Sequence, residues 1–100
     1  MGGNSTQRVD VSEGNWCEVP AWISHGQMKA IQRIIRDNRD QDMEVQTKLI
    51  NLLVSDWSFK DDEGNSIPRT AGGIESLHQT QINEVFEVLT DLIRRATPNS

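Results

Sequence analysis

The chain has 100 residues, a formal net charge of -5 and a hydrophobic fraction of 35%. A chain of this length lies in the lower part of the domain range, so we expect one small globular domain and exclude two separate cores. Its single cysteine, Cys17, excludes an internal disulfide framework and favours a reducing compartment. No apolar run approaches the roughly 18 residues of a membrane span, and no secretory signal opens the sequence, so we expect a cytosolic protein without membrane contact.

The N-terminal part of the chain is predicted to be flexible. Residues 1–15 are polar and rich in Gly, Asn and Ser, which is typical of a flexible arm. Order is expected to begin at Trp16, because apolar residues recur closely from there to Val19. Pro20 then disfavours helix in the residue before it. The stretch from Trp16 to Pro20 is therefore predicted to be a short extended segment.

A first helix is predicted from Ser24 to about Asp37. Ser24 and Gln27 have the spacing of a capping box. Apolar residues then recur at helical spacing: Met28, Ile31, Ile34 and Ile35. The opposite face carries three basic residues: Lys29, Arg33 and Arg36.

A second helix is predicted over the apolar run that follows the polar residues 37–42. One stripe carries Val45, Leu49, Leu52, Leu53 and Trp57. Ile50 and Val54 widen this stripe, so the helix is expected to be the central element and to end at Trp57.

A loop and a third long helix are predicted in the remainder of the chain. Residues 58–73 break the helical period with an acidic turn, a proline and two glycines. Ile74 and Leu77 suggest one helical turn, and Thr80 can cap the third helix. Its apolar residues are Ile82, Val85, Phe86, Leu89, Leu92 and Ile93.

These elements predict an all-α, or mainly α, fold class. We expect a three-helix core with a short extended N-terminal segment and an irregular loop between helices 2 and 3. The predicted organisation is a flexible arm over 1–15, a single helical domain over 16–96 and a flexible tail over 97–100.

The acidic turn is not predicted to bind calcium. An EF-hand loop with Gly64 at its sixth position would begin at Phe59 and end at Thr70, so both anchoring carboxylates are missing. We therefore predict no metal site, and we interpret these residues as a solvated turn.

Catalysis is not predicted. A cysteine nucleophile needs a nearby base, and Cys17 with His25 or His78 is the only combination available. Cys17 lies in an apolar segment, where an unreactive packed thiol is the commoner outcome. With no phosphate-binding glycine loop and no recognisable carboxylate pair, we predict no enzyme activity, no catalytic residue and no cofactor.

Nucleic-acid binding would use the stripe of Lys29, Arg33 and Arg36. Asp37 and Asp40 adjoin this stripe and the whole chain is acidic, so a solvated face explains it as well. We predict no nucleic-acid partner, and a small helical DNA-binding regulator remains an alternative function.

The aromatic residues are three Trp and two Phe, without Tyr. A core position is the commoner outcome for each Trp, and a partner surface is the alternative, because Trp is enriched among binding hot spots. Because metal binding, catalysis and nucleic-acid binding are not predicted, the residues indicate a protein-interaction module.

The stretch from Leu52 to Pro68 has a distinctive order of features. A long apolar helix ends in Trp57, and an apolar residue, an acidic turn with Gly and an apolar-Pro pair follow. This order resembles the tail assembly chaperones of long-tailed, siphovirus-type bacteriophages, and the likeness covers about Trp16 to Ile93. The resemblance implies a mainly helical chaperone that binds the tape measure protein, keeps it soluble and helps recruit tail tube subunits. It also implies location in the cytoplasm of the infected bacterial host and absence from the mature virion.

A chaperone of this kind needs an apolar groove between helices. We place Trp22, Met28 and Trp57 near it as partner-binding residues, because they lie at the ends of predicted elements. A structural head-to-tail connector or neck protein is the first alternative, since it would also be small, helical and acidic. The sequence leaves open whether the protein is a homo-oligomer.

Overall fold

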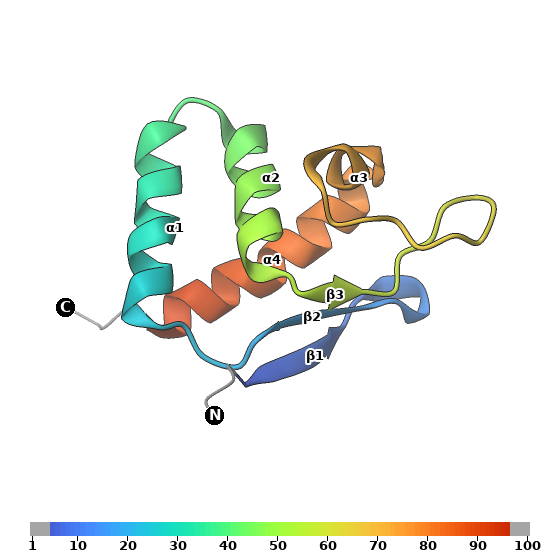
Figure 1. The fold of residues 1–100 in the computed structure, drawn as a ribbon, viewed down its shortest axis with the longest axis horizontal. Coiled ribbons are helices and arrows are strands. Elements are labelled where there is room, and N and C mark those ends of the chain that lie inside the picture. The colour runs from blue at the N-terminus through green and yellow to red at the C-terminus, as the bar shows by residue number, and fades with distance from the viewer. Residues whose placement is uncertain (1–4, 97–100) are drawn as a thin grey trace.

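The structure, a computed structural model, describes residues 5–96. In chain order its elements are β1 (Thr6–Asp10), a 3₁₀ turn (Ser12–Gly14), β2 (Trp16–Pro20), α1 (His25–Asp37), α2 (Asp42–Leu53), β3 (Asp56–Trp57), α3 (Ala71–Ser76) and α4 (Gln79–Ala96) (Figure 1). The predicted tail over 97–100 and the first four residues of the predicted arm lie outside the described residues.

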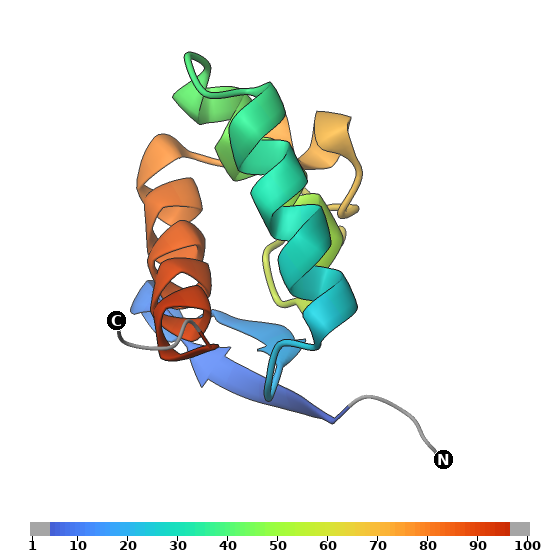
Figure 2. The ribbon, with the colours of Figure 1, turned by 90° about the vertical axis from the view of Figure 1, so that its left-hand side faces the viewer.

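The fold is mixed α/β, so the predicted all-α class is wrong. β1, β2 and β3 form an antiparallel sheet in that order, with β2 in the centre. Figure 2 shows the sheet below and the helices above it on one side. The two layers therefore bury one face of the sheet against the helices.

The central strand β2 forms where an extended segment was predicted. Its residues alternate between buried Cys17 and Val19 and the partly exposed Trp16 and Glu18. This period of two is the pattern of a strand with one face on a core.

The first strand, β1, corrects the prediction of a flexible arm over residues 1–15. It pairs with β2 along its whole length, from Thr6 opposite Pro20 to Asp10 opposite Trp16. Val9 is its one apolar residue and packs against the core. A polar sequence with a single valine has no strand signal of its own, so the pairing with β2 determines this strand.

The second helix ends four residues earlier than predicted, at Leu53. The chain then joins the sheet. The Ser55 N–H donates to the Glu18 carbonyl at 2.9 Å, and Trp57 of β3 pairs with Cys17 of β2. Trp57 is thereby placed in a strand, where its side chain is only 5% exposed. The hydrogen bonds to β2 therefore favour a strand here, although the spacing of the apolar residues predicts that the helix continues.

Two other local signals are confirmed, and the predicted Thr80 cap is wrong. Ser24 caps α1 with the expected capping box, its Oγ accepting from the Gln27 N–H at 3.1 Å and its N–H donating to Gln27 Oε1 at 2.9 Å. The predicted helical turn around Ile74 is α3, which Thr70 caps. Thr80 does not cap the last helix, because α4 begins at Gln79.

One apolar core joins all the main elements. Its buried residues include Cys17, Val19, Ile31, Leu49, Ile50, Leu53, Val54, Trp57, Phe59, Ile74, Leu77, Ile82, Val85, Leu89 and Leu92. None of the helices within residues 5–96 combines the length and the apolar character needed to cross a membrane.

Candidate functional site

The main candidate site is a hollow between α2, α3 and α4, which we call hollow A. It has a volume of about 300 Å³. Its apolar lining includes Ile74 of α3 and Leu77 directly after that helix, together with Ile82 of α4 and Met43 of α2. The first three are buried, whereas Met43 is 69% exposed. A large apolar side chain that is exposed to solvent beside a hollow with a partly apolar lining is a candidate anchor for a partner.

Met43 is exposed because of its place on α2. The side chains that point into the core from this helix are Leu49, Ile50 and Leu53. Met43 shares a helix face with Gln46 and Thr47, which also line hollow A, and with the buried Ile50, but it lies in the first turn of the helix, before the buried residues begin. The start of α2 therefore extends beyond the core and forms one wall of the hollow.

A second hollow, hollow B, is lined by residues of α1, α2 and α4 and of the link between α1 and α2. It has a volume of about 420 Å³ and is lined by Ile35, Arg39, Asp42, Val45, Gln46 and Phe86. Ile35 of α1 is 45% exposed. Gln46 lines both hollows, so the two adjoin each other.

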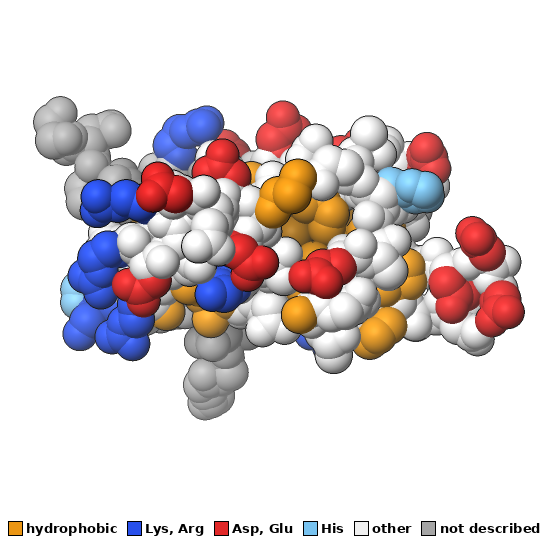
Figure 3. All heavy atoms as spheres, turned by 90° about the horizontal axis from the view of Figure 1, so that it is seen from above, with side chains coloured by type: hydrophobic (Ala, Val, Ile, Leu, Met, Phe, Trp, Pro, Cys, Tyr) orange, Lys and Arg blue, Asp and Glu red, His pale blue; other side chains and the backbone are white. Residues whose placement is uncertain are grey.

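The surroundings of hollow A are acidic. Glu44 and Glu75 line it from α2 and α3, and none of the Lys and Arg residues within 5–96 does. The ion pairs within the described residues join Arg36 with Asp37 and Arg95 with Asp91, so neither glutamate has a basic partner there. Figure 3 shows apolar side chains in the middle of this face with acidic side chains around them, and most Lys and Arg toward the left-hand end, where acidic side chains lie among them.

The structure does not bring the three predicted partner-binding residues into one groove. Trp22, in the link between β2 and α1, is 57% exposed, and Met28 of α1 is half-buried. Trp57 belongs to the core, where its ring meets Phe59 edge-on at a centroid distance of 5.4 Å and its Nε1–H donates to the Ile67 carbonyl at 2.6 Å.

Sequence reasoning missed Met43 and assigned Ile35 to a buried stripe. The signal for Met43 was available: it stands alone among the polar residues at the start of α2, outside the stripe that begins at Val45. An isolated large apolar residue in an acidic helical turn is unexpected on a solvated face.

The candidate catalytic residues come from separate elements. Cys17 is fully buried in β2, and burial raises the pKa of its thiol to about 11. His25 begins α1 and His78 links α3 to α4, and both are exposed. A buried thiol with a raised pKa is poorly suited to nucleophilic attack.

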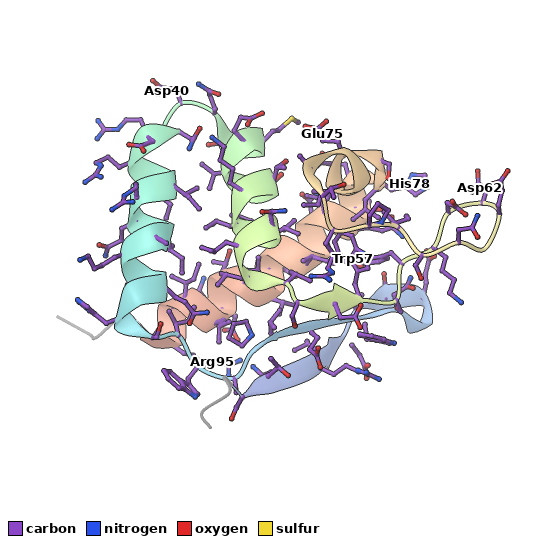
Figure 4. All side chains as sticks on the ribbon, in the orientation of Figure 1. Asp40, Trp57, Asp62, Glu75, His78 and Arg95 are labelled. Atoms are coloured by element: carbon purple, nitrogen blue, oxygen red, sulfur yellow. The ribbon has the colours of Figure 1, made fainter. Side chains whose placement is uncertain are left out.

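The acidic turn uses its own carboxylate to hold its shape. Asp61 Oδ1 accepts from the N–H groups of Glu63 and Asn65, both at 2.9 Å, and Gly64 adopts a φ of +84°. In Figure 4, Asp62 stands at the tip of this projecting loop, while Glu75 lies on α3 beside hollow A. Within residues 5–96, no group of three or more His, Cys, Asp or Glu side chains could hold a metal ion.

The basic stripe of α1 is on the surface. Lys29, Arg33 and Arg36 are all exposed, and only Arg36 forms one of the ion pairs seen in the described part of the chain. These side chains belong to the helix face that does not pack on the core.

Comparisons with known proteins gave no match among protein-family models, curated proteins or solved structures.

Proposed function

We propose that this protein is a non-enzymatic binding module that holds an apolar helical segment of a partner protein. In its specific form, the proposal is a phage tail assembly chaperone whose partner is the tape measure protein. The observation that carries the binding role is hollow A, with Met43 exposed at its side and acidic residues around it.

Helical partners bind by inserting apolar side chains into a groove between elements of the receptor. Covering a Met side chain fully contributes about 1.5–3 kcal/mol relative to leaving it in water. Met43 lies next to buried apolar residues of hollow A, so a partner that fills the hollow would also cover Met43. Hollows A and B together extend the apolar surface from α3 to α1.

The chaperone form of the proposal rests on the sequence resemblance. The order of Trp57, the acidic turn and Pro68 supports it, although Trp57 lies in a strand and not at the end of a helix. The recruitment of tail tube subunits and the location in the host cytoplasm belong to the same proposal.

Co-expression with the tape measure protein tests the proposal. We expect the tape measure protein to become soluble and to co-purify with the wild-type chain. Met43→Glu should lower the co-purified amount at least tenfold, because a charge at this position opposes apolar contact. Leu52→Glu is the matched control: Leu52 is an exposed apolar residue of the same helix that lines neither hollow.

Thermal unfolding of both variants shows whether they remain folded. Equal capture by wild type and a folded Met43→Glu variant would remove hollow A from the proposal. Capture that is lost equally in both variants would point to a general effect of added charge.

Two rival functions predict different behaviour. A head-to-tail connector would persist in purified phage particles, whereas a chaperone would be absent from them, so immunodetection on particles separates the two. A DNA-binding regulator is favoured by the exposed stripe of Lys29, Arg33 and Arg36. It would bind duplex DNA with an affinity that falls steeply as salt rises.

A further inference from the structure

We propose that the segment held at hollows A and B is a basic amphipathic helix, whose apolar face fills the two hollows while its Lys or Arg side chains pair with Glu44 and Glu75. This inference rests on the proposed binding function and adds the chemistry of the partner.

The arrangement of the two hollows matches one face of a helix. Both hollows lie between α2 and α4, where α4 contributes Gln79 and Ile82 to hollow A and Phe86 to hollow B. Ile82 and Phe86 are four residues apart on α4, which corresponds to about 6 Å along the helix axis. A partner helix lying along α4 would place apolar residues at i, i+4 and i+7 over the two hollows in turn.

A polar bridge separates the two hollows. Hollow A is about 300 Å³ and hollow B about 420 Å³. Gln46 lies between them, and its Oε1 accepts a hydrogen bond from Gln79 Nε2 at 3.4 Å. This polar bridge divides the apolar strip into two places, so we expect the apolar stripe of the partner to be anchored at two separate places.

The charge of the lining determines the sign of the partner. Hollow A has two carboxylates, Glu44 and Glu75, and hollow B has Asp42 together with Arg39. A neutral or acidic helix would cover the two glutamates without giving them a partner, which disfavours binding. Lys or Arg beside the apolar stripe would pair with these carboxylates and fix the orientation of the helix.

Arg39 lines hollow B, whereas the basic stripe of α1 lies away from both hollows. Lys29 and Arg33 are on the exposed face of α1, and Figure 3 shows most basic side chains toward one end of the face, with acidic side chains both among them and around the apolar centre. A basic helix is therefore attracted to the hollows and repelled by α1, whereas an acidic helix would be drawn to α1.

Binding of synthetic peptides tests this inference. Two labelled peptides of about 20 residues share one apolar stripe at i, i+4 and i+7, and differ only in having Lys or Glu beside it. We expect fluorescence anisotropy to show about tenfold tighter binding of the Lys peptide, because two partly exposed ion pairs each contribute modestly. A third peptide with the Lys peptide's composition and a shuffled stripe should bind much more weakly than the Lys peptide.

Charge reversal on the protein locates the effect. The Glu44→Lys/Glu75→Lys double variant should reverse the preference, so that the Glu peptide binds more tightly than the Lys peptide. The matched control is Asp62→Lys/Glu63→Lys, which changes the net charge equally at the projecting loop and should keep the wild-type preference.

The outcomes separate the inference from the proposed function. Equal binding of the Lys and Glu peptides, or equal effects of the two double variants, would overturn the inference. If the tape measure protein is still captured in a manner that depends on Met43, the proposed function stands without it. If capture is independent of Met43 while the Lys peptide binds as expected, the hollows take a basic helix and the proposed function fails.

Discussion

Gly73, which has no side chain, allows α3 to pack closely enough against Pro68 to form one wall of hollow A. A Cβ atom on Gly73 would lie 1.8 Å from the carbonyl oxygen of Pro68, whereas a Cβ on Gly72 would meet nothing within 4 Å. Pro68 and α3 therefore touch backbone to backbone, and this contact positions Ile74 and Glu75 beside the hollow.

We expect Gly73→Ala to lower the free energy of unfolding by at least about 2 kcal/mol, because the backbone of a packed segment must move. Gly72→Ala is the matched control in the same helix, and it should be neutral or stabilising by up to about 1 kcal/mol because alanine favours helix. Urea unfolding of both variants measures the difference. Equal stabilities would contradict the close contact between Pro68 and α3.

The raised pKa of the Cys17 thiol makes the stability of the protein depend on pH. Its pKa is raised from 9.0 to about 11 by burial, so the folded state keeps its proton where the unfolded state loses it. The stabilising contribution of this thiol is fully present below pH 9.0 and is lost as the pH rises through about 11. We expect the stability difference between wild type and Cys17→Ala to shrink over this range.

Unfolding in urea at several pH values measures that difference. Deprotonation of lysines affects both proteins alike, so the comparison isolates the thiol. A constant difference from pH 9.0 to 11 would show that Cys17 titrates normally in the folded protein. Thiol reagents at neutral pH should modify Cys17 only after unfolding.

At the scale of elements, helix starts and helix ends follow different rules. The start of α1 is a local matter, because Ser24 and Gln27 satisfy each other's backbone groups within one turn. The end of α2 is not, because the apolar stripe continues at helical spacing from Leu53 to Trp57. The chain leaves the helix since Ser55 and Trp57 find partners on β2.

The candidate site also combines features set by local sequence with features set by tertiary contacts. The apolar positions that build its floor, such as Ile74 and Ile82, could be assigned from their periodicity. Their assembly with Met43 into one hollow could not, because it depends on how α2, α3 and α4 meet. Trp57 is in the core, the commoner outcome expected for a tryptophan, and a hydrogen bond to Ile67 and the sheet pairing hold it there.

At the scale of the whole molecule, the sheet makes the N-terminal residues part of the domain. Val9 and Val11 pack against the core from β1 and the turn that follows it. We expect a chain that starts at Trp16 to lose about 3 kcal/mol or more of its stability, since it loses the β1–β2 ladder and this apolar contact. Thermal unfolding followed by circular dichroism measures the loss.

Point variants in the full chain provide the control for that truncation. Val9→Asp places a charge against the core, whereas Thr6→Asp places it at an exposed position of the same strand. Only Val9→Asp should destabilise strongly, while an exposed substitution usually changes stability by less than about 0.5 kcal/mol. A truncated chain as stable as the full one would restore the prediction of a flexible arm.

The sequence by itself determined the small single core, the period and cap of α1, the helical character of α4, the extended segment at β2 and the acidic turn. Each of these depends on neighbours along the chain, through side-chain periodicity, capping or turn chemistry. The strand β1, the early end of α2 and the joining of Met43 to hollow A were decided only by the tertiary structure. Their stabilising partners lie far away in the sequence, so the hydrogen bonds and apolar contacts that select them exist only once the sheet and helices have come together.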